Sequence, residues 1–174
     1  MNFIDKVKNK VKNNIRTIVL PETEDIRTLK AAELIEKEQF VKLVLIGKEE
    51  EINKLANEYA DGQVSGASHS TADTLRPALQ ILKTAPGSKV ASSFMLMDVP
   101  NCEFGENGVF VFSDCGMIQN PSSEELAEIG KASAESFELL VGKEAKVAFL
   151  SHSTFGTSKC ADVDKVNKAV SIAK

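Results

Sequence analysis

The chain has 174 residues, 43% of them hydrophobic, which is enough for one medium domain or two small ones with a real core. Its formal charge of −4 at pH 7 argues against a nucleic-acid partner, because such binding draws mainly on dense Lys and Arg fields, but it leaves a small anionic ligand open. No run approaches the roughly 20 apolar residues of a membrane helix, and the N-terminus lacks the apolar core of a secretory signal, so we expect a cytoplasmic protein.

The first part of the chain predicts a parallel βαβ unit. A β-branched run at 16–22 ends near Pro21, an amphipathic helix is expected at 25–38, and a second strand is expected at 41–47. A helix at the N-terminus, with Phe3, Ile4, Val7 and Val11 at helical spacing, and another at 49–59 complete this region.

The segment TAPGSK predicts a boundary near residues 85–87, which gives an N-terminal α/β lobe at 1–86 and a second α/β lobe at 87–174. In the second lobe, two short apolar runs joined by a turn predict an antiparallel hairpin. The expected elements are strands at 90–97 and 108–112, a helix at 121–140, a strand at 146–151 and a helix at 162–174.

The three cysteines, Cys102, Cys115 and Cys160, are odd in number and widely spaced, so they predict neither a disulfide framework nor a CxxC site. We expect buried, reduced thiols. Two histidines are too few for an unaided zinc site, and no metal is expected.

The most informative stretch is 61–80, DGQVSGASHSTADTLRPALQ. Its glycines let the backbone approach a ligand closely, and its hydroxyls precede a helix start, whose unpaired amides commonly hold phosphate. Arg76 adds a forked donor suited to phosphate oxygens. Because Pro77 follows it, the helix is expected to begin or bend there, with Arg76 at an irregular point. The alternative is a capped helix with a surface arginine.

Two further polar clusters, SDCGMIQNP at 113–121 and SHSTFGTSKC at 151–160, follow predicted strands, where open α/β sheets bind ligands. Ordinary capped turns have the same composition. A loop histidine such as His69 is more often a structural donor than a general base, and Asp73 and Asp114 suit caps or a partner for Arg76. The motifs GxSxG, GxxxxGK[ST], HExxH and GxGxxG are absent, which disfavours the corresponding enzyme classes.

The run DGQVSGASHSTADTLRPALQILKTAPG closely resembles the signature of bacterial phosphate acetyltransferases. The similarity continues through RTIVLPETEDIRTLKAA, SSFMLM, SDCGMIQNPSSEELAEIGKASAES and KVAFLSHSTFGTSKCADVDKV. The resemblance implies a two-lobed α/β/α fold with mainly parallel sheets, like isocitrate and isopropylmalate dehydrogenases, here incomplete relative to the family. It also implies transfer of an acetyl group between acetyl phosphate and coenzyme A, with coenzyme A as substrate and no other cofactor, in a homo-oligomer expected to be a dimer.

The resemblance places Arg76 at the family's phosphate-side arginine, with Ser70 and Thr71 as phosphate contacts beside it. Other cleft-lining residues would be Asn120, Ser151, Ser153 and Thr154. The chain lacks a long segment before residue 61 that carries another arginine in the family, and it also lacks the family's SRG motif, so no general base is assigned. The family usually has phenylalanine where His152 stands. A non-catalytic relative that binds phosphate or coenzyme A, or a phosphate butyryltransferase, are the alternatives.

Overall fold

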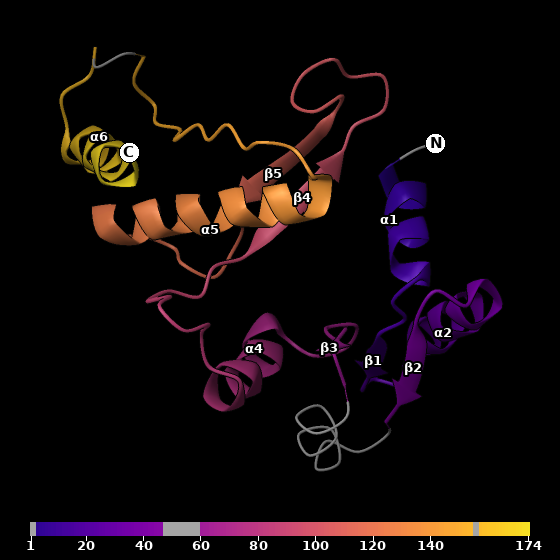
Figure 1. Ribbon diagram of the computed structural model, residues 1–174. Helices are drawn as coiled ribbons and strands as arrows, with labels where there is room; N and C mark the ends of the chain where they lie inside the picture. Colours follow the sequence, from indigo (N-terminus) through magenta and orange to yellow (C-terminus); the bar gives the residue numbers. More distant parts are fainter. Residues whose placement is uncertain (1–2, 47–59, 155–156) are drawn as a thin grey trace. The chain divides into compact units, whose positions relative to one another are not determined.

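The structure is a computed structural model that describes residues 3–46, 60–154 and 157–174 (Figure 1). The helix predicted at 49–59 lies outside the described residues. The chain divides into two compact units, Met1–Lys83 and Thr84–Lys174, close to the boundary predicted after residue 86. Among the described helices, none is long and apolar enough to cross a membrane.

The first unit is built on a small parallel sheet in the order β2-β1-β3. The expected βαβ arrangement is confirmed, because β1 pairs in parallel with β2 across the intervening helix α2. The elements of this unit are α1 (Phe3–Lys12), β1 (Thr17–Leu20), α2 (Ile26–Glu38), β2 (Lys42–Leu45), β3 (Gly62–Gln63) and α4 (Thr71–Ile81).

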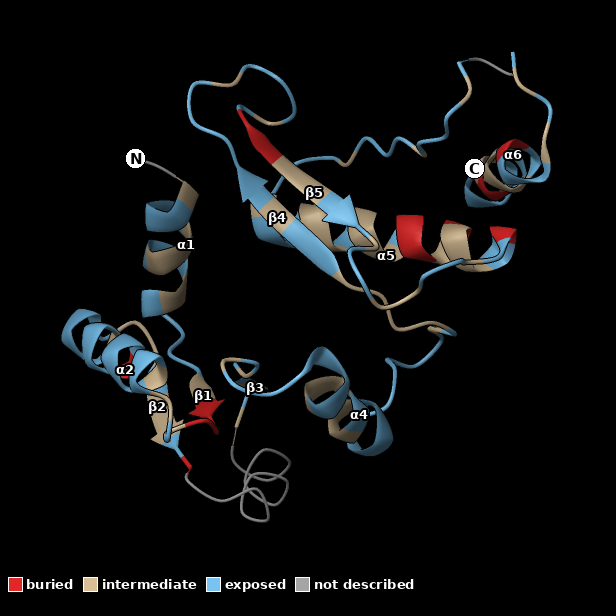
Figure 2. Ribbon diagram, turned by 180° about the vertical axis from the view of Figure 1, so that it is seen from behind, coloured by how far each residue is buried: buried red, intermediate tan, exposed pale blue. Residues whose placement is uncertain are grey.

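The central strand β1 supplies much of the core of this unit. Val19 is fully buried and Leu20 is nearly so, which Figure 2 shows as a buried patch on β1. Gly62 of β3 lies opposite Ile18 in the parallel register, and a Cβ at this glycine would approach Ile18 Cδ1 to 3.2 Å. Because β1 and β3 are adjacent and parallel, the loops that follow them leave the sheet at the same end, where the carboxyl ends of both strands lie. Residues 21–25 therefore lie next to residues 64–70.

The second unit combines an antiparallel hairpin with two helices. Its elements are β4 (Phe94–Asp98), β5 (Val109–Ser113), α5 (Ser123–Val141) and α6 (Ala161–Ala173). The predicted hairpin is confirmed by the pairing of β4 with β5, in which Leu96 lies opposite Val111. The sheet of this unit is therefore antiparallel, and the expectation of mainly parallel sheets fits only the first unit.

Helix α5 is the main packing element of the second unit and contacts both β5 and α6. Its start is fixed by a capping box between Ser122 and Glu125, close to the start predicted at residue 121. Ile129 is buried on the helix, and Gly130 passes so close to the ring of Phe149 that a Cβ there would overlap the ring. On α6, the buried residues are Val163 and Ala169.

Two expectations for the second unit are wrong. Residues 146–151 do not form a strand, because none of the described strands pairs with them, and Val147 and Leu150 remain largely exposed. The cysteines are free thiols, as expected, but they are not buried: Cys115 is exposed, and Cys102 and Cys160 are half-buried. They lie in or beside turns and at a helix start, where neighbouring elements do not enclose them.

Candidate functional site

A buried carboxylate, Glu22, lies at the centre of the hydroxyl-rich turn of the first unit. Its side chain is only 4% exposed. Oε2 accepts hydrogen bonds from the backbone nitrogens of Gly66 and Ala67, both at 2.7 Å. Oε1 accepts from the backbone nitrogens of Ser68 at 2.9 Å and His69 at 3.0 Å, and from Ser68 Oγ at 3.2 Å. Four successive amides therefore converge on one side chain.

These hydrogen bonds decide the charge of Glu22. Burial alone raises the pKa of the carboxyl group, but the hydrogen bonds from Ser68, His69 and Ala67 outweigh burial and hold that pKa well below its usual range. Glu22 is therefore ionised throughout the ordinary pH range. The amides from Gly66 to His69 therefore already bind an anion, which is the protein's own Glu22 carboxylate.

The prediction that the amides of this turn hold a ligand phosphate is therefore wrong for residues 66–69. A carboxylate offers about four lone-pair sites, and six donor contacts already fill them. Gly66 permits the arrangement because its φ of +104° lies in a region that favours glycine. Close backbone approach was correctly expected here, but the group approached is Glu22.

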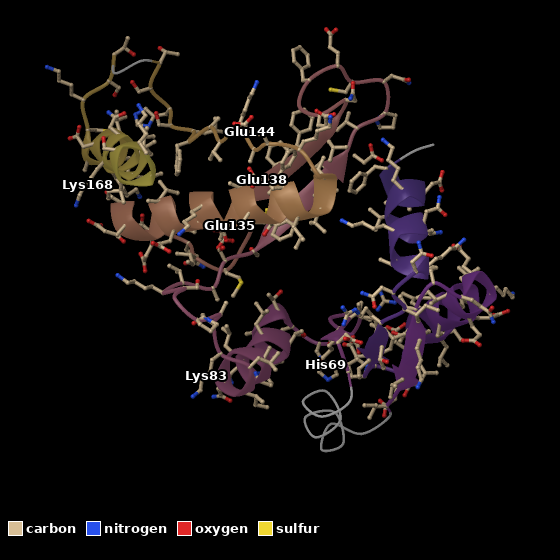
Figure 3. All side chains as sticks on the ribbon, viewed as in Figure 1. His69, Lys83, Glu135, Glu138, Glu144 and Lys168 are labelled. Carbon is tan, nitrogen blue, oxygen red and sulfur yellow. The ribbon has the colours of Figure 1, made fainter. Side chains whose placement is uncertain are left out.

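The ring of His69, which is labelled in Figure 3, lies in the turn between β3 and α4. His69 Nδ1 lies 2.8 Å from Glu22 Oε1. Because an ionised carboxylate can only accept, Nδ1 must carry the proton. This contact supports the interpretation of His69 as a structural donor.

A second group of contacts holds the same turn from its other side. The Arg27 guanidinium donates to the backbone oxygen of Ala67 and also to the carboxylate of Asp25. Asp25 in turn caps α2 by accepting from the backbone nitrogen of Arg27 at 2.7 Å. The loop after β1 thus contacts the amides of the turn after β3, and the first turn of α2 contacts a carbonyl group of the same turn.

Helix α4 begins directly after this turn. Ser70 is its N-cap, with Oγ accepting from the backbone nitrogen of Asp73 at 3.2 Å and donating to Asp73 Oδ2 at 2.6 Å. Thr71 is the first helical residue. The backbone amides of Thr71 and Ala72 have no acceptor among the residues that the structure describes. They are open amides at the start of α4.

The expectation that the helix begins or bends at Pro77 is wrong about the beginning, because α4 starts at Thr71 and continues through Pro77. Arg76 therefore lies inside the helix. Its side chain is exposed and makes no hydrogen bond or ion pair with any other described residue. Arg76 is four positions after Ala72, so both lie on one helix face, and helical side chains lean toward the N-terminus. The guanidinium can therefore reach the open amides.

The cluster at 113–121 is also closed by an internal carboxylate. Asp114 Oδ1 accepts from the backbone nitrogens of Gly116 at 2.8 Å and Met117 at 3.0 Å, and Ser93 Oγ donates to the same oxygen. Burial raises the pKa of Asp114, but these hydrogen bonds prevail and lower it to about 2. Asn120 Oδ1 accepts from Lys165 Nζ of α6 at 2.8 Å.

The third cluster, at 151–160, forms hydrogen bonds mainly within itself. Ser151 Oγ accepts from the backbone nitrogen of Ser153 at 3.2 Å, and Ser153 Oγ accepts from that of Ser158 at 2.9 Å. Thr154 Oγ1 lies 3.3 Å from Thr157 Oγ1. Of the expected site residues, Ser70, Thr71 and Arg76 belong to the start of α4 in the first unit, and Asn120, Ser151, Ser153 and Thr154 belong to the second unit.

Sequence reasoning missed Glu22. The available signal was an acidic residue just after the buried strand β1. The turn that follows the adjacent parallel strand β3 contains glycine and lies at the same end of the sheet.

Comparisons with known proteins agree with this sequence pattern over the whole chain. The sequence model of the phosphate acetyl/butaryl transferase family matches residues 2–59 and 53–174. The phosphate acetyltransferase of Acetivibrio thermocellus is 40% identical over 230 residues, covering 100% of this chain and 69% of that protein. The phosphate acetyltransferase of Thermoanaerobacterium thermosaccharolyticum is 41% identical and covers 100% of this chain and 70% of its own length.

A solved structure supports the same relationship. The crystal structure of a phosphotransacetylase from Streptococcus pyogenes matches with a TM-score of 0.82 and 31% identity, covering 98% of this chain and 68% of that one. This match shows an α/β fold with a parallel sheet.

The alignments also locate a difference within the chain. The alignment with the Acetivibrio protein runs over 230 positions, whereas this chain has 174 residues, so the relative has internal residues with no counterpart here. The two matched segments of the family model meet at residues 53–59, outside the described residues. Since the family model spans the chain and the relatives exceed 30% identity over most of their length, this protein belongs to the phosphate acetyl/butaryl transferase family.

Proposed function

We propose that the chain is a phosphate acetyltransferase, which transfers an acetyl group reversibly between acetyl phosphate and coenzyme A. The observation that carries this proposal is the match of the entire chain, at about 40% identity, to proteins named phosphate acetyltransferase. The shortened length relative to these proteins is the reason that activity must be measured on this chain itself.

The start of α4 is the proposed phosphate subsite. A helix N-terminus presents partial positive charge and unpaired amides, and α4 offers the amides of Thr71 and Ala72. Arg76 can add a charged, forked donor from the same helix face. The hydroxyl of Thr71 is a further candidate donor, whereas Ser70 contributes mainly as the cap, since its hydroxyl is bonded to Asp73. Four open donors would be enough for a phosphate group.

The proposed reaction is a direct acyl transfer. The sulfur of coenzyme A forms a bond to the acetyl carbon, and the bond between that carbon and the bridging oxygen breaks. The phosphate leaves with the electron pair, and its negative charge is stabilised by Arg76 and the helix amides. The thiol loses its proton to an acceptor that we do not assign. Asn120, Ser151, Ser153 and Thr154 remain proposed contacts to the rest of the substrates.

The test is an assay that follows thioester formation from acetyl phosphate and coenzyme A, using folded full chain. We expect turnover above background, and its absence would refute the enzymatic proposal. Butyryl phosphate, assayed in parallel, distinguishes the acetyltransferase from a butyryltransferase. A higher kcat/KM for butyryl phosphate would change the assigned acyl group.

A second candidate function is binding without turnover. It is favoured by a difference in length: the relatives have internal residues that this chain lacks, and in the relatives those residues can contribute to the active site. Calorimetry with acetyl phosphate and coenzyme A separates the two functions. Binding of both ligands without thioester formation would favour the second.

A homodimer and a cytoplasmic location belong to the same proposal. Support for a dimer comes from the hairpin, where Met95 lies opposite Phe112 and both are more than half exposed. Met97, two positions along β4, is 43% exposed on the same face. Exposed apolar faces of this kind are typical of contacts between chains. Light scattering after gel filtration measures the mass in solution.

A further inference from the structure

We infer that Glu22 is a positioning residue for the phosphate subsite: its carboxylate holds the turn 66–69 and so fixes the start of α4. This inference rests on the proposed function of the α4 start. It adds a residue from the loop after β1, which makes no contact with the proposed phosphate position itself.

Glu22 satisfies every backbone amide from Gly66 to His69. Each of the four amides from Gly66 to His69 donates to its carboxylate at 2.7–3.0 Å. A side chain that satisfies four successive amides determines the backbone path of the turn, because each peptide plane must point inward. These contacts hold the turn in the observed conformation without a bound ligand.

The connection from this turn to the open amides is short. His69, the last residue bound by Glu22, is followed directly by the cap Ser70, whose φ of −68° and ψ of 158° begin the helix. The peptide planes of Thr71 and Ala72 come next. A rotation of the turn would therefore redirect the same amides that are proposed to bind phosphate.

Glu22 also has an electrostatic effect. Four inward-pointing amides form a concave site that attracts anions, and an empty site of this kind would compete with α4 for phosphate. The ionised Glu22 fills it and would repel a second anion placed there. A phosphate ligand is thereby directed to the amides of Thr71 and Ala72.

Arg27 strengthens the same arrangement from outside. Its guanidinium donates to the carbonyl oxygen of Ala67, so the peptide group between Ala67 and Ser68 is bonded at both its oxygen and its nitrogen. Residues 22–27 and 66–69 therefore behave as one bonded unit at the edge of the sheet.

The experiment compares Glu22→Gln with Glu24→Gln in the full chain. Glu24 is exposed on the same loop, so its substitution changes the net charge equally without touching the turn. Dissociation constants for inorganic phosphate and for coenzyme A are measured by calorimetry. For Glu22→Gln we expect phosphate affinity to fall about tenfold, the loss typical of one impaired charge-assisted contact, with coenzyme A affinity within about twofold. Glu24→Gln should leave both affinities unchanged.

If Glu22→Gln does not fold, Glu22→Asp carries the test. Aspartate keeps the carboxylate, but its side chain is one methylene shorter, so the carboxylate lies farther from the amides while the charge remains. Phosphate affinity should fall several-fold, again without loss of coenzyme A affinity. In either variant, unchanged phosphate affinity, or parallel loss of both ligands, would overturn the positioning role.

The wild-type chain separates this inference from the function on which it rests. If the wild type binds phosphate and turns over acetyl phosphate while both Glu22 variants bind phosphate equally well, only the positioning role is refuted. If the wild type neither binds phosphate nor forms thioester, the proposed function and the positioning role are refuted together.

Discussion

Glu22 Oε2 lies 2.7 Å from the backbone nitrogen of Gly66, although the two residues are 44 positions apart in the sequence. This contact joins the loops that follow two adjacent parallel strands, β1 and β3. A helix start with open amides can be ordered at that place because an internal anion, and not a ligand, satisfies the preceding turn.

Glu22→Gln should destabilise the first unit. The amide group of Gln presents hydrogens to backbone nitrogens that are themselves donors, and each buried donor left unpaired costs roughly 1–3 kcal/mol. Urea unfolding followed by circular dichroism measures the change. The control Glu24→Gln, on the exposed neighbour, should alter the free energy of unfolding by less than about 0.5 kcal/mol. Equal stability of the two variants would show that the contacts to Glu22 contribute little.

The stability of the chain should fall in acid, and Asp114 should account for part of the fall. Its pKa is lowered from an ordinary value of 3.8 to about 2, so its contribution is complete above pH 3.8 and is lost as the pH falls toward 2. Glu22, with its lowered pKa, contributes in the same direction. In Asp114→Asn, the free energy of unfolding should depend less on pH between these values. An unaltered pH dependence would contradict the shift.

Gly66→Ala should destabilise the turn through the backbone alone. The nearest atom to an added Cβ is Thr74 Oγ1 at 4.0 Å, so there is room, but φ is +104°. Holding a non-glycine residue there costs on the order of 1–3 kcal/mol. Gly116→Ala is the matched control, because an added Cβ at Gly116 meets nothing within 4 Å and its φ is not in that region. Thermal unfolding of both variants distinguishes strain from a general effect of alanine.

Arg76→Ala should raise the KM for acetyl phosphate with little change in stability, because the side chain is exposed and unpaired among the described residues. Loss of a charge-assisted contact to phosphate is worth about 1.5–3 kcal/mol, or roughly a tenfold to hundredfold increase. Steady-state kinetics with Arg76→Lys as the conservative variant should give an intermediate KM. An unchanged KM in Arg76→Ala would place the phosphate elsewhere.

Gly130→Ala should destabilise the second unit by about 1–3 kcal/mol, since its Cβ would overlap the Phe149 ring. The double variant Gly130→Ala with Phe149→Leu should recover part of the loss, because the smaller side chain leaves space. Chemical unfolding of the single and double variants measures the coupling. Strictly additive effects would mean that the helix shifts to avoid the ring.

Much of the local structure was predictable from the sequence. Apolar periodicity and turn residues predicted the βαβ order and the hairpin, and they placed the start of α5 within two residues. These features depend on residues close together in the sequence, so a linear pattern contains the information.

The contacts of Glu22, the start of α4 and the structure of residues 146–151 could not be predicted. They depend on contacts between residues far apart in the sequence or on competing local preferences. The partners of Glu22 lie more than 40 positions away, and no periodicity relates them. At Pro77 the missing amide predicted a helix boundary, but the cap at Ser70 starts α4 earlier and the helix tolerates one absent hydrogen bond. The segment 146–151 has the composition of a strand, yet none of the described strands pairs with it.

The separation of Glu22 from its partners also has a kinetic consequence. Its carboxylate and the amides of residues 66–69 are more than 40 positions apart, and such non-local contacts form slowly because a long loop must first close. We therefore expect the contact to form late in the folding of the first unit. Weakening it should accelerate unfolding while leaving the refolding rate almost constant, so this carboxylate governs how long the unit stays folded more than how quickly it forms.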